Sequence, residues 1–177
     1  MKLVILDRDG VINYDSDAFI KHPDEWRPIP GSLDAIAQLT QAGWRVVVAT
    51  NQSGVGRGLF TMETLNAINA KMHKAAAQAG GRIEAVFYSP DTADSKSPNR
   101  KPGPGMFLAI GERFHAALEH VPAVGDSLRD LQAAAEVKAQ PILVLTGKGQ
   151  KTRAAGGLPQ GTTVYPDLAA VAQALCQ

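Results

Sequence analysis

The sequence predicts a doubly wound α/β fold, with a mainly parallel sheet and helices on both faces. Short apolar runs alternate with segments of helical periodicity, as in repeated βαβ units. The first run, residues 3–6, is entirely apolar, which is typical of a strand buried on both sides. A chain of 177 residues suits one compact domain and is short for two, so we expect a single domain over residues 1–177.

The first half of the chain contains three predicted strands and two predicted helices. Strands are expected over residues 3–6, 45–49 and 85–88. The first helix should start near Pro30 to Ser32, and Gly43 is a plausible C-cap. The second helix should follow Thr61 as N-cap, cover residues 62–79 and end at the glycine pair that follows. Gly54 to Gly58 lack the dinucleotide-binding spacing and are interpreted as a mobile loop that faces substrate.

The second half begins with a loop over residues 89–101, in which Pro90 and Pro98, with Pro102 directly after it, disfavour regular structure. Helices are expected over residues 105–118, 128–139 and 168–175, and strands over 121–124, 142–145 and near Val164. No repeat or linker interrupts this alternation of strands and helices.

Composition and charge narrow the classes of protein that fit the sequence. The 18 basic residues nearly balance the 17 acidic residues, which argues against a nucleic-acid surface or a protein drawn to anionic membranes. No apolar run approaches the ~20 residues of a membrane span, and the N-terminus lacks the pattern of a signal peptide. The one cysteine, Cys176, allows neither an internal disulfide nor a thiolate zinc site. We therefore expect a cytoplasmic protein.

Four polar clusters follow predicted strands. They are Asp7-Arg8-Asp9-Gly10, Thr50-Asn51-Gln52-Ser53, Arg100-Lys101 after the proline-rich loop, and Gly125-Asp126 with Asp130. In a doubly wound sheet, ligands bind beyond the carboxyl ends of the strands. The clusters are distant in the sequence, but the fold should bring them to one rim of the sheet. Their convergence indicates a functional site more strongly than any single cluster does.

Asp7, Asp9 and Asp126 are candidate metal ligands. Carboxylates crowded at the end of a buried strand repel each other unless a cation or a proton intervenes. Mg²⁺ fits best, because it prefers oxygen ligands in octahedral geometry and retains several waters. Taken singly, each Asp also fits a turn or a helix cap. Asp130 suits either direct ligation or a supporting role, such as orienting Lys101 or a metal-bound water.

The other two clusters offer groups that suit phosphate oxygens. Thr50 offers a hydroxyl, and the turn over residues 51–54 offers backbone N–H groups. Lys101 can place a point charge on a phosphoryl group, and Arg100 can make a forked contact with phosphate or a sugar oxygen. Alone, either cluster also fits an ordinary turn or a solvated loop.

With the four clusters in this order, nearly the whole chain resembles the haloacid dehalogenase (HAD) superfamily of phosphohydrolases. The residues similar to its four motifs are, in order, Asp7 to Val11; Thr50 with Asn51; Lys101; and Gly125 to Ser127 with Asp130. The resemblance implies a magnesium-dependent phosphatase that forms a covalent phospho-aspartate. It also implies a fold without a large cap domain, because the connections between the predicted elements are short.

The resemblance assigns a role to each matching residue. Asp7 would be the nucleophile, and Asp9 would be the general acid that protonates the leaving oxygen and later activates water. Thr50 and Lys101 would stabilise the phosphoryl group during its transfer. Mg²⁺ would be bound by Asp7, by the backbone carbonyl of Asp9 and by Asp126.

Within the superfamily, the chain looks like the small capless phosphatases that act on a heptose bisphosphate or on histidinol phosphate. Ser53 and Arg57 favour the heptose bisphosphate, because histidinol phosphatases typically have Asp at the first position and no arginine at the second. A bisphosphate carries a second anion, which extra arginines would help to bind. The substrate-binding residues implied in this way are Asp15, Ser16, Asp17, Ala18, Asn51, Gln52, Ser53, Arg57 and Arg100.

Other activities remain open at this point. They are hydrolysis of histidinol phosphate or another small metabolite by the same mechanism, phosphoryl transfer to a second sugar, and binding of a phosphosugar without catalysis. Transfer to a sugar would usually need a cap that excludes water, and both Asp7 and Asp9 argue against a purely binding role. We expect a small phosphosugar as the partner, no nucleic acid, no membrane and a monomeric chain.

One departure from the capless group concerns zinc. Its members usually carry Cys and His zinc ligands between the third strand and the Arg-Lys pair. Residues 89–99 of this chain contain neither residue type. We therefore expect no zinc, and we expect hydrogen bonds and prolines to order this loop instead.

Overall fold

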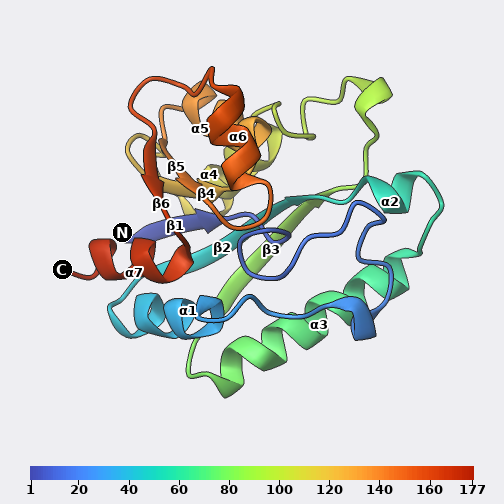
Figure 1. The fold of residues 1–177 in the computed structure, drawn as a ribbon, viewed down its shortest axis with the longest axis horizontal. Coiled ribbons are helices and arrows are strands. Elements are labelled where there is room, and N and C mark those ends of the chain that lie inside the picture. The colour runs from blue at the N-terminus through green and yellow to red at the C-terminus, as the bar shows by residue number, and fades with distance from the viewer.

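A six-stranded parallel sheet forms the centre of the computed structural model, which describes residues 1–177 (Figure 1). The strands are β1 (Leu3–Leu6), β2 (Arg45–Asn51), β3 (Ile83–Ser89), β4 (Pro122–Gly125), β5 (Gln140–Val144) and β6 (Thr163–Tyr165). Their spatial order is β3-β2-β1-β4-β5-β6, and every neighbouring pair is parallel. The predicted fold class, a doubly wound α/β sheet without a large cap domain, is confirmed.

Helices cover both faces of this sheet. They are α1 (Ser32–Gln41), α2 (Ser53–Gly56), α3 (Met62–Gln78), α4 (Gly105–Phe114), α5 (Leu128–Glu136), α6 (Gly149–Ala155) and α7 (Leu168–Leu175), with 3-10 turns at Pro23–Glu25 and Ala93–Ser95. Apolar side chains of α1, α3 and α7 pack on one face of the sheet, and those of α4 and α5 pack on the other. None of the helices is both long enough and apolar enough to cross a membrane.

The alternation of side chains along β1 explains why this strand is central. Val4 and Leu6 belong to the core on the side of α1 and α3, whereas Leu3 and Ile5 belong to the core on the side of α4. All four side chains are buried, as a strand with helices on both faces requires. β1 therefore places the residue that follows it, Asp7, at the middle of the sheet's rim.

Two predicted helices end earlier than the apolar pattern suggests. α4 stops at Phe114 rather than near residue 118, because His115 adopts a left-handed conformation with φ of 49°. α5 stops at Glu136 rather than near residue 139, and Lys138 shortly after it has φ of 60°. Left-handed residues end a helix because they turn the backbone away from its axis.

The segment that follows β2 is helical where the sequence predicts a mobile loop. Ser53–Gly56 form the short helix α2. A side chain at Gly54 would overlap Phe60, and one at Gly56 would overlap the carbonyl of Pro90. These glycines therefore allow close packing, and the expectation of a loop is wrong for this part of the segment, which is helical. The sequence analysis also missed α6 and both 3-10 turns.

The position of β1 between β2 and β4 fixes where a ligand can bind. From β1 the chain crosses first toward β2 and β3, and later returns to β4 on the other side. Ligands of such sheets bind at this reversal, beyond the carboxyl ends of the strands. The tips of β1, β2 and β4 therefore meet there, and each is followed by one of the polar clusters.

Candidate active site

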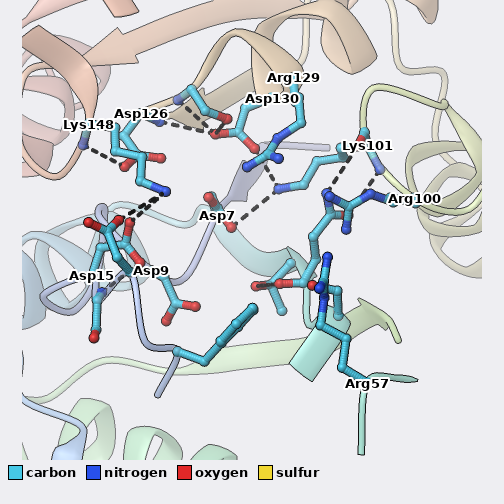
Figure 2. Close-up of a pocket in the computed structure, with 17 residues that line it drawn as sticks. Asp7, Asp9, Asp15, Arg57, Arg100, Lys101, Asp126, Arg129, Asp130 and Lys148 are labelled. Atoms are coloured by element: carbon cyan, nitrogen blue, oxygen red, sulfur yellow. Dashed lines mark hydrogen bonds and ion pairs between the residues drawn. The ribbon is translucent and has the colours of Figure 1, made fainter. Parts of the chain in front are cut away.

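A polar cavity of about 270 Å³ lies beyond the carboxyl ends of the strands (Figure 2). Of the residues that the sequence singles out, those that line it are Asp7, Asp9, Asp15, Ser16, Asp17, Thr50, Asn51, Ser53, Arg57, Arg100, Lys101, Asp126, Ser127 and Asp130. Only one of the 17 lining residues is hydrophobic. A cavity of this kind suits a small, charged ligand.

Three carboxylates converge on the floor of this cavity. Asp7 follows β1, while Asp126 and Asp130 follow β4, and one oxygen from each lies within 4.8 Å of the others. Burial, followed by the negative charge of Asp130, raises the pKa of Asp7 well above its usual range. The same two causes raise the pKa of Asp126 to about 7. Positive charge is therefore needed before all three carboxylates can be ionised together.

Lys101 supplies part of that charge. Its Nζ lies 2.7 Å from Asp130 Oδ1 and 3.2 Å from Asp7 Oδ1, and it donates to the carbonyl of Ala49 at 2.8 Å. Burial opposes the charged form, but Asp130 and Asp7 together raise the pKa of Lys101 above its usual value. Lys101 is therefore held as a cation beside Asp7.

The side chain of Asn51 fixes the backbone at Lys101. Asn51 Oδ1 accepts from the Lys101 N–H, and Asn51 Nδ2 donates to the Lys101 carbonyl, both at 3.0 Å. These bonds join the tip of β2 to the end of the proline-rich loop, 50 residues later. Asn51 lines the cavity, but both ends of its amide are already engaged, so its observed contribution is to position Lys101.

Asp130 also has both of its oxygens engaged. Oδ1 is paired with Lys101, while Oδ2 accepts from the backbone N–H groups of Asp126 and Ser127 and from the Ser127 hydroxyl. Ser127 and Asp130 form a capping box at the start of α5. Of the two roles left open for Asp130, this geometry favours support of Lys101 over direct metal ligation.

Asp9 lies in a dense set of hydrogen bonds. Arg8 Nε and Asn13 Nδ2 each donate to Asp9 Oδ1 at 2.9 Å, and Gln52 Nε2 donates to Oδ2 at 3.2 Å. Burial opposes the charged form, but the Arg8 guanidinium and these hydrogen bonds hold the pKa of Asp9 below its usual value. Arg8 itself is fully buried. Sequence analysis assigned no role to Arg8 or Asn13.

Gln52 and Ala18, two of the nine predicted substrate-binding residues, do not line the cavity. The side chain of Gln52 turns inward and donates to the Thr50 hydroxyl at 2.9 Å as well as to Asp9. Ala18 faces a neighbouring hollow. Both predictions rested on sequence position, which does not determine the direction of a side chain.

Arg129 and Lys148 line the cavity but were missed. Lys148 Nζ approaches Asp15 at 3.4 Å and Asp17 at 3.9 Å, and the Lys148 N–H donates to Asp126 Oδ2 at 2.9 Å. Lys148 comes shortly after β5, whose carboxyl end lies at the same rim of the sheet. Its place after a strand could therefore have marked it as a candidate site residue. Arg129 stands directly before Asp130, a residue that the sequence analysis did single out.

The donor set at the floor of the cavity fits Mg²⁺. Its side-chain ligands are all carboxylate oxygens, which are the ligands that this hard cation prefers. Burial, and after it the charge of Asp130, raises the pKa values of Asp7 and Asp126, and a divalent cation would favour the ionised form of both. A side chain at Gly10 or Gly147 would overlap the Asp126 carboxylate, so both positions keep space open beside it.

Comparisons with known proteins agree with the fold and this donor set. A family model described as HAD-hydrolase-like matches residues 98–171. A D-glycero-β-D-manno-heptose-1,7-bisphosphate 7-phosphatase of Bordetella bronchiseptica is 62% identical over 177 residues, which cover 100% of this chain and 99% of that protein. An enzyme of the same name from Neisseria meningitidis is 52% identical, with 100% of this chain and 96% of that protein covered.

Solved structures give the same result. The crystal structure of the D,D-heptose 1,7-bisphosphate phosphatase of B. bronchiseptica, complexed with magnesium and phosphate, superposes with a TM-score of 0.97 at 62% identity, covering 99% of this chain and 98% of that one. The enzyme from Burkholderia thailandensis gives a TM-score of 0.78 at 55% identity, with the same coverage.

The fold and the site together define a phosphohydrolase of the HAD superfamily, as the sequence motifs predict. Within that class, the chain belongs to the family of D-glycero-β-D-manno-heptose-1,7-bisphosphate 7-phosphatases.

Replacing Asp7 by Asn tests whether this carboxylate is the nucleophile. We expect Asp7→Asn to reduce the rate of phosphate release by at least about 10³-fold, because an amide oxygen is a poor nucleophile. The melting temperature should not fall, since the change preserves shape and removes a repelling charge. Asp34→Asn, at an exposed position of α1, is the matched control and should retain full activity. Substantial turnover by Asp7→Asn would contradict the assignment.

The raised pKa of Asp126 predicts that magnesium binding depends on pH. With a pKa of about 7 in the metal-free protein, Asp126 is protonated at pH 6 and ionised at pH 8. Because the metal needs the ionised form, the Kd for Mg²⁺ should rise about tenfold or more as the pH falls from 8 to 6. Calorimetric titration of phosphate-free protein with Mg²⁺ measures this change. Equal Kd values at the two pH values would show that Asp126 is not a ligand.

Proposed function

We propose that this chain is a magnesium-dependent phosphatase that removes the 7-phosphate from D-glycero-β-D-manno-heptose 1,7-bisphosphate. One observation carries the proposal: the tips of β1 and β4 place Asp7 and Asp126 together, with Lys101 3.2 Å from Asp7. The names of relatives that match 99–100% of this chain at 51–62% identity support the choice of substrate.

Mg²⁺ would be held by Asp7, by the backbone carbonyl of Asp9 and by Asp126. When bound, it neutralises negative charge on the phosphoryl oxygens and on the carboxylates around them. Lys101 adds a second positive charge, 3.2 Å from Asp7. Thr50 adds a hydroxyl donor: Gln52 donates to its oxygen, and its own proton makes only a long, 3.5 Å contact with the Asn51 carbonyl, which a phosphate oxygen would replace.

In the first step, a carboxylate oxygen of Asp7 attacks phosphorus, and the bond from phosphorus to the sugar oxygen breaks. Asp9 gives a proton to that leaving oxygen. In the structure the pKa of Asp9 is held low, chiefly by Arg8 against the effect of burial. A negatively charged phosphate next to Asp9 raises its proton affinity, which is what a general acid requires.

In the second step, water attacks the phosphorus of phospho-Asp7. Asp9 takes a proton from that water, inorganic phosphate leaves, and the Asp7 carboxylate is regenerated. The bonds from Arg8, Asn13 and Gln52 keep the ionised Asp9 in place for this role as a base. Each proton that Asp9 gives in the first step is thus recovered in the second.

The walls of the cavity suit the rest of the substrate. Arg57 and Arg100 line one side, where they would bind the phosphate that is not hydrolysed. Asp15 lies on the opposite side (Figure 2), and it lines the cavity together with Ser16 and Asp17; these residues would accept hydrogen bonds from sugar hydroxyls. A ligand with an anion at each end and hydroxyls between them matches this distribution of charge.

The proposal extends to the state in which the chain works. Residues 1–177 would act as a single catalytic domain, as a monomer in the cytoplasm, on a free phosphosugar rather than on nucleic acid or at a membrane. The near balance of 18 basic and 17 acidic residues supports the choice of a small-molecule partner.

A comparison of substrates tests the proposed function. Phosphate release should be measured for heptose 1,7-bisphosphate, heptose 7-phosphate and histidinol phosphate, each with and without Mg²⁺. We expect the highest kcat/KM for the bisphosphate, and no turnover after chelation of the metal. In ¹⁸O-labelled water, the label should appear in the released phosphate. A higher kcat/KM for histidinol phosphate, or phosphate without label, would overturn the proposal.

Arg57→Ala tests the assignment of the second phosphate. Loss of a charged hydrogen bond should reduce the preference for the bisphosphate over the 7-phosphate, expressed as a ratio of kcat/KM values, by about tenfold or more. The measurement is the kinetics of both substrates for both proteins. An unchanged ratio would remove Arg57 from the site of the second phosphate.

A further inference from the structure

Arg129 lies on the same side of the cavity as Arg57 and Arg100, and no motif explains its presence. It is the second residue of α5 and lines the cavity. Figure 2 shows its guanidinium directed into the cavity, on the same side as Arg100. It therefore adds a cation from a third element, since Arg57 follows α2 and Arg100 ends the proline-rich loop.

These three arginines differ from the lysines of the cavity in forming no ion pair, although Arg100 donates to the Asp91 carbonyl at 3.2 Å and feels the charge of its carboxylate. Lys101 is paired with Asp7 and Asp130, and Lys148 lies near Asp15. None of the three guanidinium groups forms an ion pair. The site thus contains an excess of positive charge on one wall, and an anionic ligand would balance it.

The arginines also act on one another. After burial, Arg129 is the charge that most lowers the pKa of Arg100, and Arg57 follows. Like charges repel, and an anion bound between these guanidinium groups would offset the repulsion. The charge of Arg129 therefore acts on Arg100, as the charge of Arg57 does. Lys101, in contrast, is the cation that acts on Asp7.

Local structure gives no reason for a cation at position 129. The start of a helix carries partial positive charge, so an arginine in the first turn is unfavourable there. Ser127 and Asp130 already satisfy the cap of α5. Arg129 thus opposes the charge preference of the helix start, and it has no ion pair that would explain its presence. Residues that break a local rule in this way are expected at functional sites.

We propose that Arg129 is a specificity-determining residue that binds the phosphate of the substrate that is not hydrolysed, together with Arg57 and Arg100. The identity of that anion as a sugar phosphate rests on the proposed function. Forked N–H donors from three elements would surround the phosphate oxygens, and this favours a bisphosphate over a monophosphate.

Kinetics of Arg129→Gln test the inference. The ratio of kcat/KM for heptose 1,7-bisphosphate to that for heptose 7-phosphate should fall about tenfold or more relative to the wild type. Arg129→Lys, which keeps the charge without the fork, should show a smaller fall. The melting temperature of Arg129→Gln should be equal or higher, because a cation leaves the helix start. Arg113→Gln, at an exposed position of α4 outside the cavity, is the kinetic control and should keep the wild-type ratio of kcat/KM values.

A second measurement separates this inference from the proposed function. Mannose 1-phosphate, which lacks the reacting phosphate, should inhibit hydrolysis of p-nitrophenyl phosphate competitively, and Arg129→Gln should weaken the inhibition constant about tenfold or more. If the wild type does not prefer the bisphosphate, the proposed substrate is wrong, and the inhibition constants still test the role of Arg129. Equal inhibition of both proteins, or an equal loss of kcat/KM for both heptose substrates, would overturn the inference.

Discussion

The repulsion among three crowded carboxylates, those of half-buried Asp7 and buried Asp126 and Asp130, is the constraint on which the rest of this site depends. Asp7, Asp126 and Asp130 come within 4.8 Å of one another, and burial raises the cost of ionising all of them. Lys101 offsets part of this cost through its contacts with Asp7 and Asp130. The remaining excess of negative charge is what a magnesium ion would balance, so the same crowding that destabilises the metal-free protein prepares it to bind the cofactor.

The fold creates this crowding through the order of its strands. β1 lies between β2 and β4, so residues that are more than 100 positions apart in the chain reach the same rim of the sheet. Hydrogen bonds then fix Lys101, which lies at the end of a long loop and is not positioned by a strand. Asn51 holds the backbone of Lys101, and Asp130 binds Lys101 while it caps α5. The positive charge beside the nucleophile is therefore held from two directions, which suits a group that must not move during phosphoryl transfer.

Strands were predicted more accurately than the ends of helices, for a physical reason. A buried strand such as β1 is a short apolar run that the sequence shows directly. The ends of α4 and α5 depend on His115 and Lys138, which adopt a left-handed conformation. Neither residue is a glycine, so residue type alone does not mark these positions as helix ends. α2 was missed because its glycines indicate a flexible loop, whereas in the structure Gly54 and Gly56 permit close contact with Phe60 and Pro90.

The sequence by itself determined the fold class, the clusters that end the strands and the family, because residue type and spacing along the chain carry that information. Tertiary structure decided which side chains reach the cavity. Gln52 turns inward to Asp9 and Thr50, whereas Arg129 and Lys148, which no motif marks, line the site. The direction of a side chain depends on packing and hydrogen bonds with segments that are remote in the sequence, and these contacts exist only after the chain has folded.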